Sequence, residues 1–176
     1  PFIMMRTPYG IDGRARVFDG YFKDLVAEGY IFVFQDDRGR FKSEGQFVMQ
    51  RALREKGDSK AIDESTDAYD TIDWLIKNVP NNNGRVGMLG ISYDGWLTVM
   101  AMLDPHPALK AAVPESPMID GWMGDDWFHY GAFRQVNLDY FTEQTTVRGA
   151  GQAVVRQGYD DYENFRRAGS AGDWAK

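Results

Sequence analysis

The sequence of 176 residues contains no cysteine and only two histidines. The lack of cysteine excludes disulfide bonds, thiolate metal sites and cysteine nucleophiles. No apolar run is long enough to span a bilayer, and no cluster of His, Asp and Glu has the spacing of metal ligands, so neither a metal nor another cofactor is expected. Acidic residues outnumber basic ones, 26 to 20, and the net charge is −6. This charge argues against a nucleic acid or an anionic membrane as a partner, because either requires a basic surface.

Apolar runs alternate with amphipathic stretches along the first two thirds of the chain, which is the pattern of a parallel sheet with crossover helices. Strands are predicted over residues 2–6, 30–35, 85–91 and 109–114, and helices from Phe18 to Gly29, over 63–79 and over 95–103. Residues 36–50 are predicted to form a polar loop that contains glycine. Residues 1–117 are therefore interpreted as part of an α/β core.

The character of the chain changes after Pro117. Residues 118–176 are rich in Trp, Tyr, Phe, Asp, Gly and Arg and show no alternation of strands and helices. We interpret them as the start of a helical cap over the carboxyl edge of the sheet. At the other end, residues 1–7 already predict a strand without an initiator Met, so we expect the sequence to begin inside a domain.

The segment Gly-Ile-Ser-Tyr-Asp-Gly at residues 90–95 matches the G-x-S-x-G pattern of a nucleophile elbow. A predicted strand precedes it and a predicted helix follows it, which is the context that this motif requires. The alternative is a serine in an ordinary glycine-rich turn, and the strand and helix favour the elbow. Ser92 is therefore the candidate nucleophile.

A serine nucleophile needs a histidine as its base, and neither histidine suits this role. His106 follows the predicted helix one helix length from Ser92, and we expect it at the surface or at the helix end. His129 lies only 37 residues beyond Ser92, and we expect it to be packed in the second region, with a position in the cap near the pocket as the alternative. The economical explanation is that the sequence is a fragment that lacks its acid and base, and that it is inactive alone. The alternative is a complete, non-catalytic binding domain.

An oxyanion hole is the second requirement of acyl transfer, and its first expected donor is the backbone N–H of Tyr93. The second donor is expected from the loop after the first strand, where Tyr9 lies. Its hydroxyl is one candidate, and a packed ring in a Pro-Tyr-Gly turn is the alternative that spacing alone favours.

Two further segments contain clustered charges. Asp125 and Asp126 lie between Trp122 and Trp127, a combination that suits a substrate ammonium group near a serine site. The alternative is that one of these carboxylates is a helix N-cap before Trp127, and the residues alone favour the cap. In residues 36–40, an ion pair of Asp37 with Arg38 or Arg40 is expected rather than a metal or phosphate site.

Several motifs together resemble the α/β-hydrolases that include cocaine esterase and the X-Pro dipeptidyl-peptidases, and the downstream ones narrow the resemblance to the α-amino acid ester hydrolases. The segments that carry it are residues 6–10, 35–41 with 43–45, 90–95, 104–110, 113–128, 130–135 and 157–162. The resemblance covers nearly the whole chain.

This resemblance implies a partial α/β-hydrolase fold and a serine hydrolase or acyltransferase that acts on esters and amides of α-amino acids, including β-lactam antibiotics. It implies Ser92 as nucleophile, the Tyr93 N–H and the Tyr9 hydroxyl as oxyanion donors, and Asp126 as a ligand of the substrate's α-ammonium group. It also implies that the triad acid, the histidine and a jelly-roll domain lie beyond this sequence. The full-length protein is expected to be periplasmic or secreted, to form a tetramer and to take a small-molecule substrate.

Two rival functions remain open. One is another enzyme of the same group, an X-Pro dipeptidyl-peptidase or an acylase for glutaryl side chains, and the latter requires a cation rather than a carboxylate to bind its substrate. The other is the binding domain on an α/β-hydrolase scaffold.

Overall fold

The computed structural model describes residues 1–137, 140, 143–144, 149 and 160–169. The chain forms two compact units, Pro1–Pro117 and Met118–Lys176.

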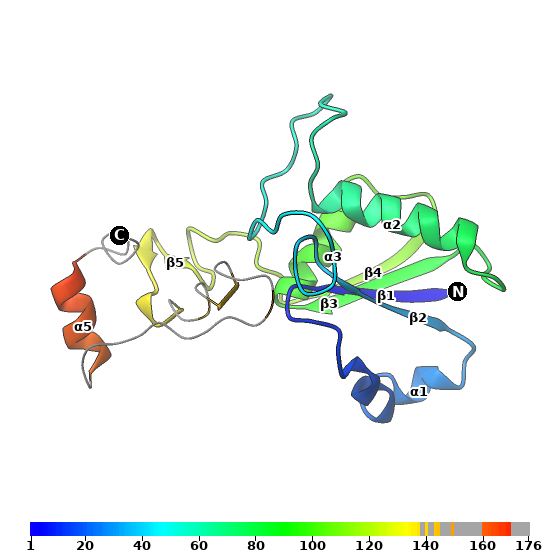
Figure 1. Ribbon diagram of the computed structural model, residues 1–176, viewed down its shortest axis with the longest axis horizontal. Coiled ribbons are helices and arrows are strands. Elements are labelled where there is room, and N and C mark those ends of the chain that lie inside the picture. Colours follow the sequence, from blue (N-terminus) through cyan, green and yellow to red (C-terminus); the bar gives the residue numbers. More distant parts are fainter. Residues whose placement is uncertain (138–139, 141–142, 145–148, 150–159, 170–176) are drawn as a thin grey trace. The chain divides into compact units, whose positions relative to one another are not determined.

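The first unit contains a parallel sheet of four strands in the order β2-β1-β3-β4 (Figure 1). The strands are β1 (Phe2–Thr7), β2 (Ile31–Asp36), β3 (Val86–Ile91) and β4 (Leu109–Glu115). The chain passes from β1 outward to β2, and later returns to place β3 on the other side of β1. Loops that leave β1 and β3 therefore diverge at the carboxyl edge, the position where open parallel sheets bind their ligands.

Both faces of this sheet contribute to a core, because successive side chains of a strand point to opposite faces. Phe2 and Met4 pack with Ile72 on one face, and Ile3 and Met5 pack with Phe22 on the other. Figure 1 shows α2 (Glu64–Asn78) on one side of the sheet and α1 (Lys23–Val26) on the opposite side. Helix α3 (Tyr93–Leu103) contacts α2 and strands β1, β3 and β4. The α/β fold class predicted from the sequence is confirmed.

Helix α2 agrees closely with its prediction, and its start is fixed by local hydrogen bonds. The Asp63 carboxylate accepts from the Thr66 N–H at 2.8 Å, and the Thr66 hydroxyl accepts from the Asp63 N–H at 3.0 Å. This capping box satisfies N–H groups that have no partner within a helix.

The predicted helix from Phe18 to Gly29 is wrong as a single element. The structure has a short 3-10 helix, η1 (Arg14–Asp19), followed by the single turn of α1. Gly20 separates them with φ −131° and ψ −95°, far from helical values. An apolar residue of the predicted helix still contributes to the core, since Phe22 is buried against the sheet.

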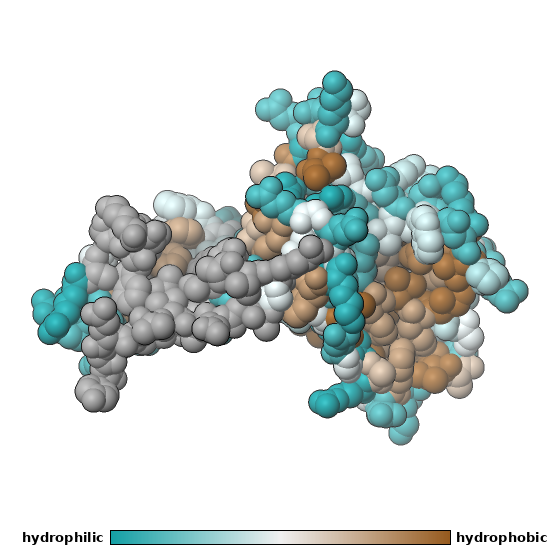
Figure 2. All heavy atoms as spheres, in the orientation of Figure 1, coloured by the Kyte–Doolittle hydropathy of each residue, from teal (hydrophilic) through white to brown (hydrophobic). Residues whose placement is uncertain are grey.

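Hydrophobic residues also gather on the visible face of the first unit over the sheet (Figure 2). A cavity of about 370 Å³ is lined by residues of strands β1, β3 and β4 and of their flanks, which include Ile3, Tyr30 and Val113. Val113 is 52% exposed in this structure.

The described part of the second unit contains a short antiparallel hairpin of β5 (Phe128–His129) and β6 (Ala132–Phe133), followed by η2 (Gln135–Asn137) and α5 (Asp161–Ala168). Tyr130 and Gly131 form the hairpin turn with φ of 49° and 81°, as turns between two such strands require. The hairpin was not expected from the sequence. The interpretation of this unit as a cap over the sheet stays a prediction.

Candidate active site at the carboxyl edge of the sheet

Ser92 lies on the turn between β3 and α3 with φ 61° and ψ −117°. A positive φ is strained for a residue with a side chain, and such strain is concentrated at functional sites. The Ser92 N–H donates to the Glu115 carbonyl oxygen at the end of β4 at 2.9 Å, and the Ser92 carbonyl oxygen accepts from the Trp96 N–H at 2.9 Å. The turn is thus tied to both the neighbouring strand and the helix that it starts.

Two glycines allow this turn to form. A Cβ atom on Gly90 would lie 2.2 Å from the Asp94 carbonyl oxygen, and one on Gly95 would lie 2.6 Å from the Glu115 carbonyl oxygen. Both contacts are with backbone atoms, so a side chain at either position would force the backbone itself to move. Helix α3 therefore approaches β3 and β4 at distances that only glycine permits.

We predict that Gly90→Ala strongly destabilises the first unit, by more than about 3 kcal/mol, because the new methyl group clashes with backbone. The matched control is Gly87→Ala on the same strand, whose Cβ would lie 3.8 Å from the Phe2 carbonyl oxygen, an ordinary van der Waals distance. That change should cost less than about 1 kcal/mol. Urea unfolding of both variants measures the difference, and equal losses would contradict the close-approach argument.

Tyr93 follows Ser92 and begins α3. Its side chain is fully buried, and its hydroxyl accepts from the Gln50 N–H at 2.8 Å. Its ring lies edge-on to those of Trp96 and Tyr9, at centroid distances of 5.3 Å and 6.3 Å. These contacts fix the residue whose backbone N–H is the predicted oxyanion donor.

Tyr9 lies in the loop after β1, and its ring contact with Tyr93 brings this loop next to the elbow. Its backbone N–H donates to Thr7 Oγ1 at 3.3 Å, and the residue is 39% exposed. The ring is therefore packed on one side and open on the other. Both interpretations of Tyr9 from the sequence are compatible with this environment.

Asp94 is a buried carboxylate behind the elbow that the sequence analysis did not single out. The Arg14 guanidinium lies 3.5 Å from its Oδ2 and donates to Thr7 Oγ1 at 3.0 Å, so Asp94 links α3 to the end of β1 and to η1. Its other oxygen, Oδ1, has no hydrogen-bond partner within the described residues. Burial raises the pKa of Asp94 to about 6, although Thr7 and Arg14 oppose the shift and the Asp37 charge adds to it.

The raised pKa of Asp94 predicts the direction in which the stability of the fold changes with pH. Protonation of Asp94 stabilises the fold at low pH, and this contribution is lost as the pH rises from the unfolded pKa to about 6. Asn is neutral at every pH, so Asp94→Asn does not lose this stability as the pH rises. We therefore expect the stability of the variant relative to wild type to rise between pH 4 and pH 7, by on the order of 1–3 kcal/mol.

Urea unfolding of both proteins at the two pH values measures this difference, and a constant difference would contradict it. Asp73→Asn is the control of opposite sign. The hydrogen bond from Lys77 lowers the pKa of Asp73, so this variant should lose stability relative to wild type as the pH rises.

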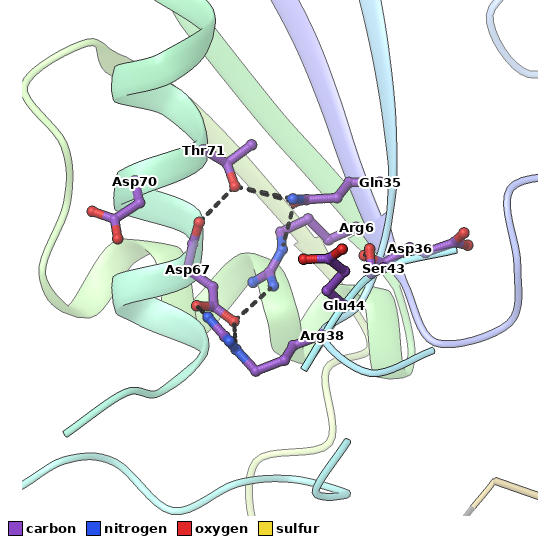
Figure 3. Close-up of a pocket in the computed structure, with 9 residues that line it drawn as sticks. All are labelled: Arg6, Gln35, Asp36, Arg38, Ser43, Glu44, Asp67, Asp70 and Thr71. Atoms are coloured by element: carbon purple, nitrogen blue, oxygen red, sulfur yellow. Dashed lines mark hydrogen bonds and ion pairs between the residues drawn. The ribbon is translucent and has the colours of Figure 1, made fainter. Parts of the chain in front are cut away.

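A second buried charge cluster joins the end of β1, the loop after β2 and the first turns of α2, and Figure 3 shows part of it. The Arg6 guanidinium is 1% exposed and lies 2.9 Å from both the Asp37 and the Glu64 carboxylates. It also donates to Gln35 Oε1 and to the Glu64 carbonyl oxygen, each at 3.0 Å. One strand end, one loop and the first turn of α2 are thereby held to a single side chain.

Arg38 extends this cluster through Asp67, to which its Nε donates at 2.7 Å. The sequence predicts an ion pair of Asp37 with Arg38 or Arg40. The structure pairs Asp37 with Arg6, and the Arg38 guanidinium with Asp67. A cavity of about 240 Å³ borders the cluster, and Figure 3 shows the Arg6 and Arg38 guanidinium groups paired with Asp67 at its wall.

Glu64 is the most perturbed carboxyl group of this cluster. Burial raises its pKa to about 8. The Arg6 charge opposes this rise, and the charges of Asp37 and Asp67 add to it. Three carboxylates around Arg6 and Arg38 give one negative charge in excess, which is consistent with an upward shift.

His106 lies just past the end of α3, close to one of its two predicted positions, whereas His129 differs from its prediction. His106 is buried rather than at the surface: its Nδ1 accepts from the Ala108 N–H at 3.0 Å, and its ring packs on Tyr69. It follows the far end of α3, a helix roughly 16 Å long, and so is not placed to act on Ser92. His129 contacts the ring of Tyr130 but is exposed, so the expectation that it packs inside the second unit is wrong.

Asp126 precedes the hairpin of the second unit. The interpretation of Asp125 or Asp126 as an N-cap is wrong, because strand β5 rather than a helix follows Trp127. The Asp126 carboxylate is half exposed and lies 3.4 Å from the Arg134 guanidinium, while its backbone N–H donates to Asp125 Oδ1 at 2.8 Å. Trp127 beside it is buried and stacks on Tyr140.

Across the ranges given above, no group of His, Asp and Glu is arranged to hold a metal ion. In the same part of the chain, no helix has the length and apolar character needed to cross a membrane.

Comparison with known families places this architecture. The sequence matches the family described as X-Pro dipeptidyl-peptidase (S15 family) over residues 1–176. The chain belongs to this family. Among characterised sequences it is similar to cocaine esterase of Rhodococcus sp. (strain MB1 Bresler), with 32% identity over 125 residues, which cover 68% of this chain and 19% of the esterase.

Two solved structures are also similar. One is an α-amino acid ester hydrolase labelled with selenomethionine, with 58% identity and a TM-score of 0.89. The other is an aminopeptidase from the marine sediment archaeon Thaumarchaeota archaeon, with 44% identity and a TM-score of 0.86. Each match covers 99% of this chain and 30% of the other chain. The predicted resemblance and the partial α/β-hydrolase fold are confirmed, and the chain spans less than a third of the length of these relatives.

Proposed function

We propose that this chain is part of a serine hydrolase that cleaves esters and amides of α-amino acids through an acyl-enzyme on Ser92. The observation that carries this proposal is the strained turn of Ser92 at the carboxyl edge of the sheet, next to the loop of Tyr9. Chemistry of this kind requires an exposed nucleophile on a rigid turn and preorganised donors beside it. Similarity to an α-amino acid ester hydrolase supports the choice of substrate.

In the proposed reaction, Ser92 Oγ attacks the carbonyl carbon of the substrate and loses its proton to a base. The oxyanion that forms accepts from the Tyr93 N–H and the Tyr9 hydroxyl, and the positive end of the α3 dipole favours its charge. Collapse of this intermediate expels the alcohol or amine and leaves the acyl group on Ser92. Water, or an acceptor amine such as a β-lactam nucleus, then takes the acyl group.

The base is proposed to lie in the part of the protein that the longer relatives have and this chain does not. His106 is buried at the other end of α3. The periplasmic or secreted location and the tetramer of the full-length protein likewise remain proposals that rest on the resemblance.

Asp126 is proposed to bind the substrate's α-ammonium group. An α-amino ester and a peptide N-terminus both present this group, so the same carboxylate suits the alternative activity of an X-Pro dipeptidyl-peptidase, which the family description and the similar aminopeptidase favour. Arg134 beside Asp126 competes for the carboxylate. Binding of the ammonium therefore requires Asp126 to exchange or share its partner.

The role of Ser92 is tested by labelling the full-length protein with a fluorophosphonate probe. We expect the wild type to be labelled and to hydrolyse an α-amino ester, and Ser92→Ala to lose both properties by at least about 10³-fold. Thr98→Ser, a buried change on the same helix, serves as the folding control. Persistent turnover in Ser92→Ala would contradict the proposed function, and no labelling of a folded wild type would favour the binding domain.

The role of Asp126 is tested with an α-amino ester and its des-amino analogue. We expect Asp126→Asn to lower kcat/KM selectively for the amino ester, by about 5- to 150-fold, since a charge-assisted hydrogen bond is worth about 1–3 kcal/mol. Asp125→Asn is the matched control, because Asp125 is the neighbouring carboxylate without this proposed role. If Asp126→Asn lowers kcat/KM equally for both substrates, the carboxylate does not bind the ammonium group.

A further inference from the structure

The loop that follows β2 contains a deeply buried arginine, Arg40, to which the proposed reaction assigns no role. Arg40 is 1% exposed, and a fully buried arginine is rare unless its guanidinium has specific partners. Its Nε–H donates to the Pro8 carbonyl oxygen at 2.9 Å. This oxygen belongs to the peptide group that joins Pro8 to Tyr9, so the contact is made directly before the proposed oxyanion donor.

The guanidinium of Arg40 is itself held in place by two aromatic rings. Its central carbon lies 5.2 Å from the Phe41 ring centroid and 5.3 Å from that of Phe47, within the range of a cation–π contact. The Arg40 N–H also donates to the Asp37 carbonyl oxygen at 2.9 Å. The donor of the Pro8 contact is therefore fixed from several directions.

The residue after Tyr9 is held by the same loop. Gly10 has φ 92°, and a Cβ atom there would lie 3.0 Å from the Phe41 ring. The ring of Phe41 thus packs directly on the Gly10 backbone. Tyr9 is consequently held on both sides, by Arg40 through Pro8 and by Phe41 through Gly10.

The same loop also reaches the other proposed donor. At its far end, the Gln50 N–H donates to the Tyr93 hydroxyl at 2.8 Å. The loop after β2 thus contacts both elements of the proposed oxyanion hole. A catalytic donor must be held to within about 0.5 Å, which requires neighbours that are themselves fixed.

We propose that Arg40 is a positioning residue that sets the Tyr9 hydroxyl for the oxyanion by fixing the Pro8–Tyr9 peptide group. This inference rests on the proposed function, because it assigns Arg40 a role in that reaction. Arg40 touches neither substrate nor reacting atoms, and it acts through Tyr9.

The first test is the steady-state kinetics of Arg40→Lys in the full-length protein with an α-amino ester. Lysine keeps a cation near Phe41 and Phe47 but lacks the Nε–H that binds Pro8. We expect kcat to fall about 10- to 100-fold, with KM changed less than about threefold, because the loss is confined to the transition state. If Arg40→Lys retains the wild-type kcat, the proposal is overturned.

A double-mutant cycle with Tyr9→Phe separates positioning from general destabilisation. If Arg40 acts through the Tyr9 hydroxyl, Arg40→Lys should lower kcat less than about threefold once that hydroxyl is gone. Full additivity of the two changes would contradict the proposal. Arg38→Lys is the matched control: Arg38 lies in the same loop but pairs with Asp67, so its effect should be small and equal in both backgrounds.

Amide hydrogen exchange provides a readout that does not depend on catalysis. Arg40→Lys should speed exchange of residues 7–11 by about tenfold or more at a temperature where the rest of the first unit keeps its protection. Unchanged exchange there would overturn the positioning role whether or not the protein is a hydrolase. Turnover that survives Ser92→Ala would contradict the proposed function alone, while faster exchange in Arg40→Lys would still support the contact.

Discussion

The close approach of α3 to the ends of β3 and β4 is the constraint on which the site depends. Gly90 lies against the Asp94 carbonyl oxygen and Gly95 against that of Glu115, so the chain must reverse within a few residues. Ser92 accommodates this reversal with a positive φ that costs on the order of 1–3 kcal/mol. The hydrogen bonds of its N–H and carbonyl group to Glu115 and Trp96 offset this cost.

Buried charges hold the remaining loops around this turn. Arg6 binds the end of β1 to the loop after β2 and to α2, and Arg40 binds that same loop to Pro8. Apolar packing is non-directional, whereas a guanidinium fixes both distance and orientation of its acceptors. Desolvation makes such groups costly, and their value here is the placement of specific atoms rather than net stability.

The strands, α2 and the elbow were predictable because their signals are local. Apolar runs, the first acidic turn of α2 and the glycines around Ser92 each determine structure within a few positions. The Arg6 cluster was not predictable, since Arg6 and Glu64 are 58 positions apart. The burial of His106 depends likewise on contacts with Tyr69 and Asp73 of another helix.

The candidate site also has one part that local signals predict and another that depends on contacts between distant residues. The turn of Ser92 follows from its motif, and the contact of Tyr9 with Tyr93 required the sheet order, which places β1 beside β3. Spacing alone favours a packed ring for Tyr9 and a helix N-cap at Asp126. The resemblance implies instead that Tyr9 donates to the oxyanion and that Asp126 binds the substrate's ammonium group. The local pattern failed at Asp126 because the hairpin after it depends on pairing between β5 and β6 rather than on a helix start signal.

The division into two units has a consequence for how specificity arises. Ser92, Tyr93 and Tyr9 all belong to the first unit, while Asp126 and its partner Arg134 belong to the second. Hydrolysis of an ester and hydrolysis of a peptide both require attack on an acyl carbon, so the proposed chemistry at Ser92 suits either bond. What distinguishes their substrates is the group attached to that carbon. The proposed function therefore assigns the acyl chemistry to residues of the first unit and binding of the α-ammonium group to a residue of the second.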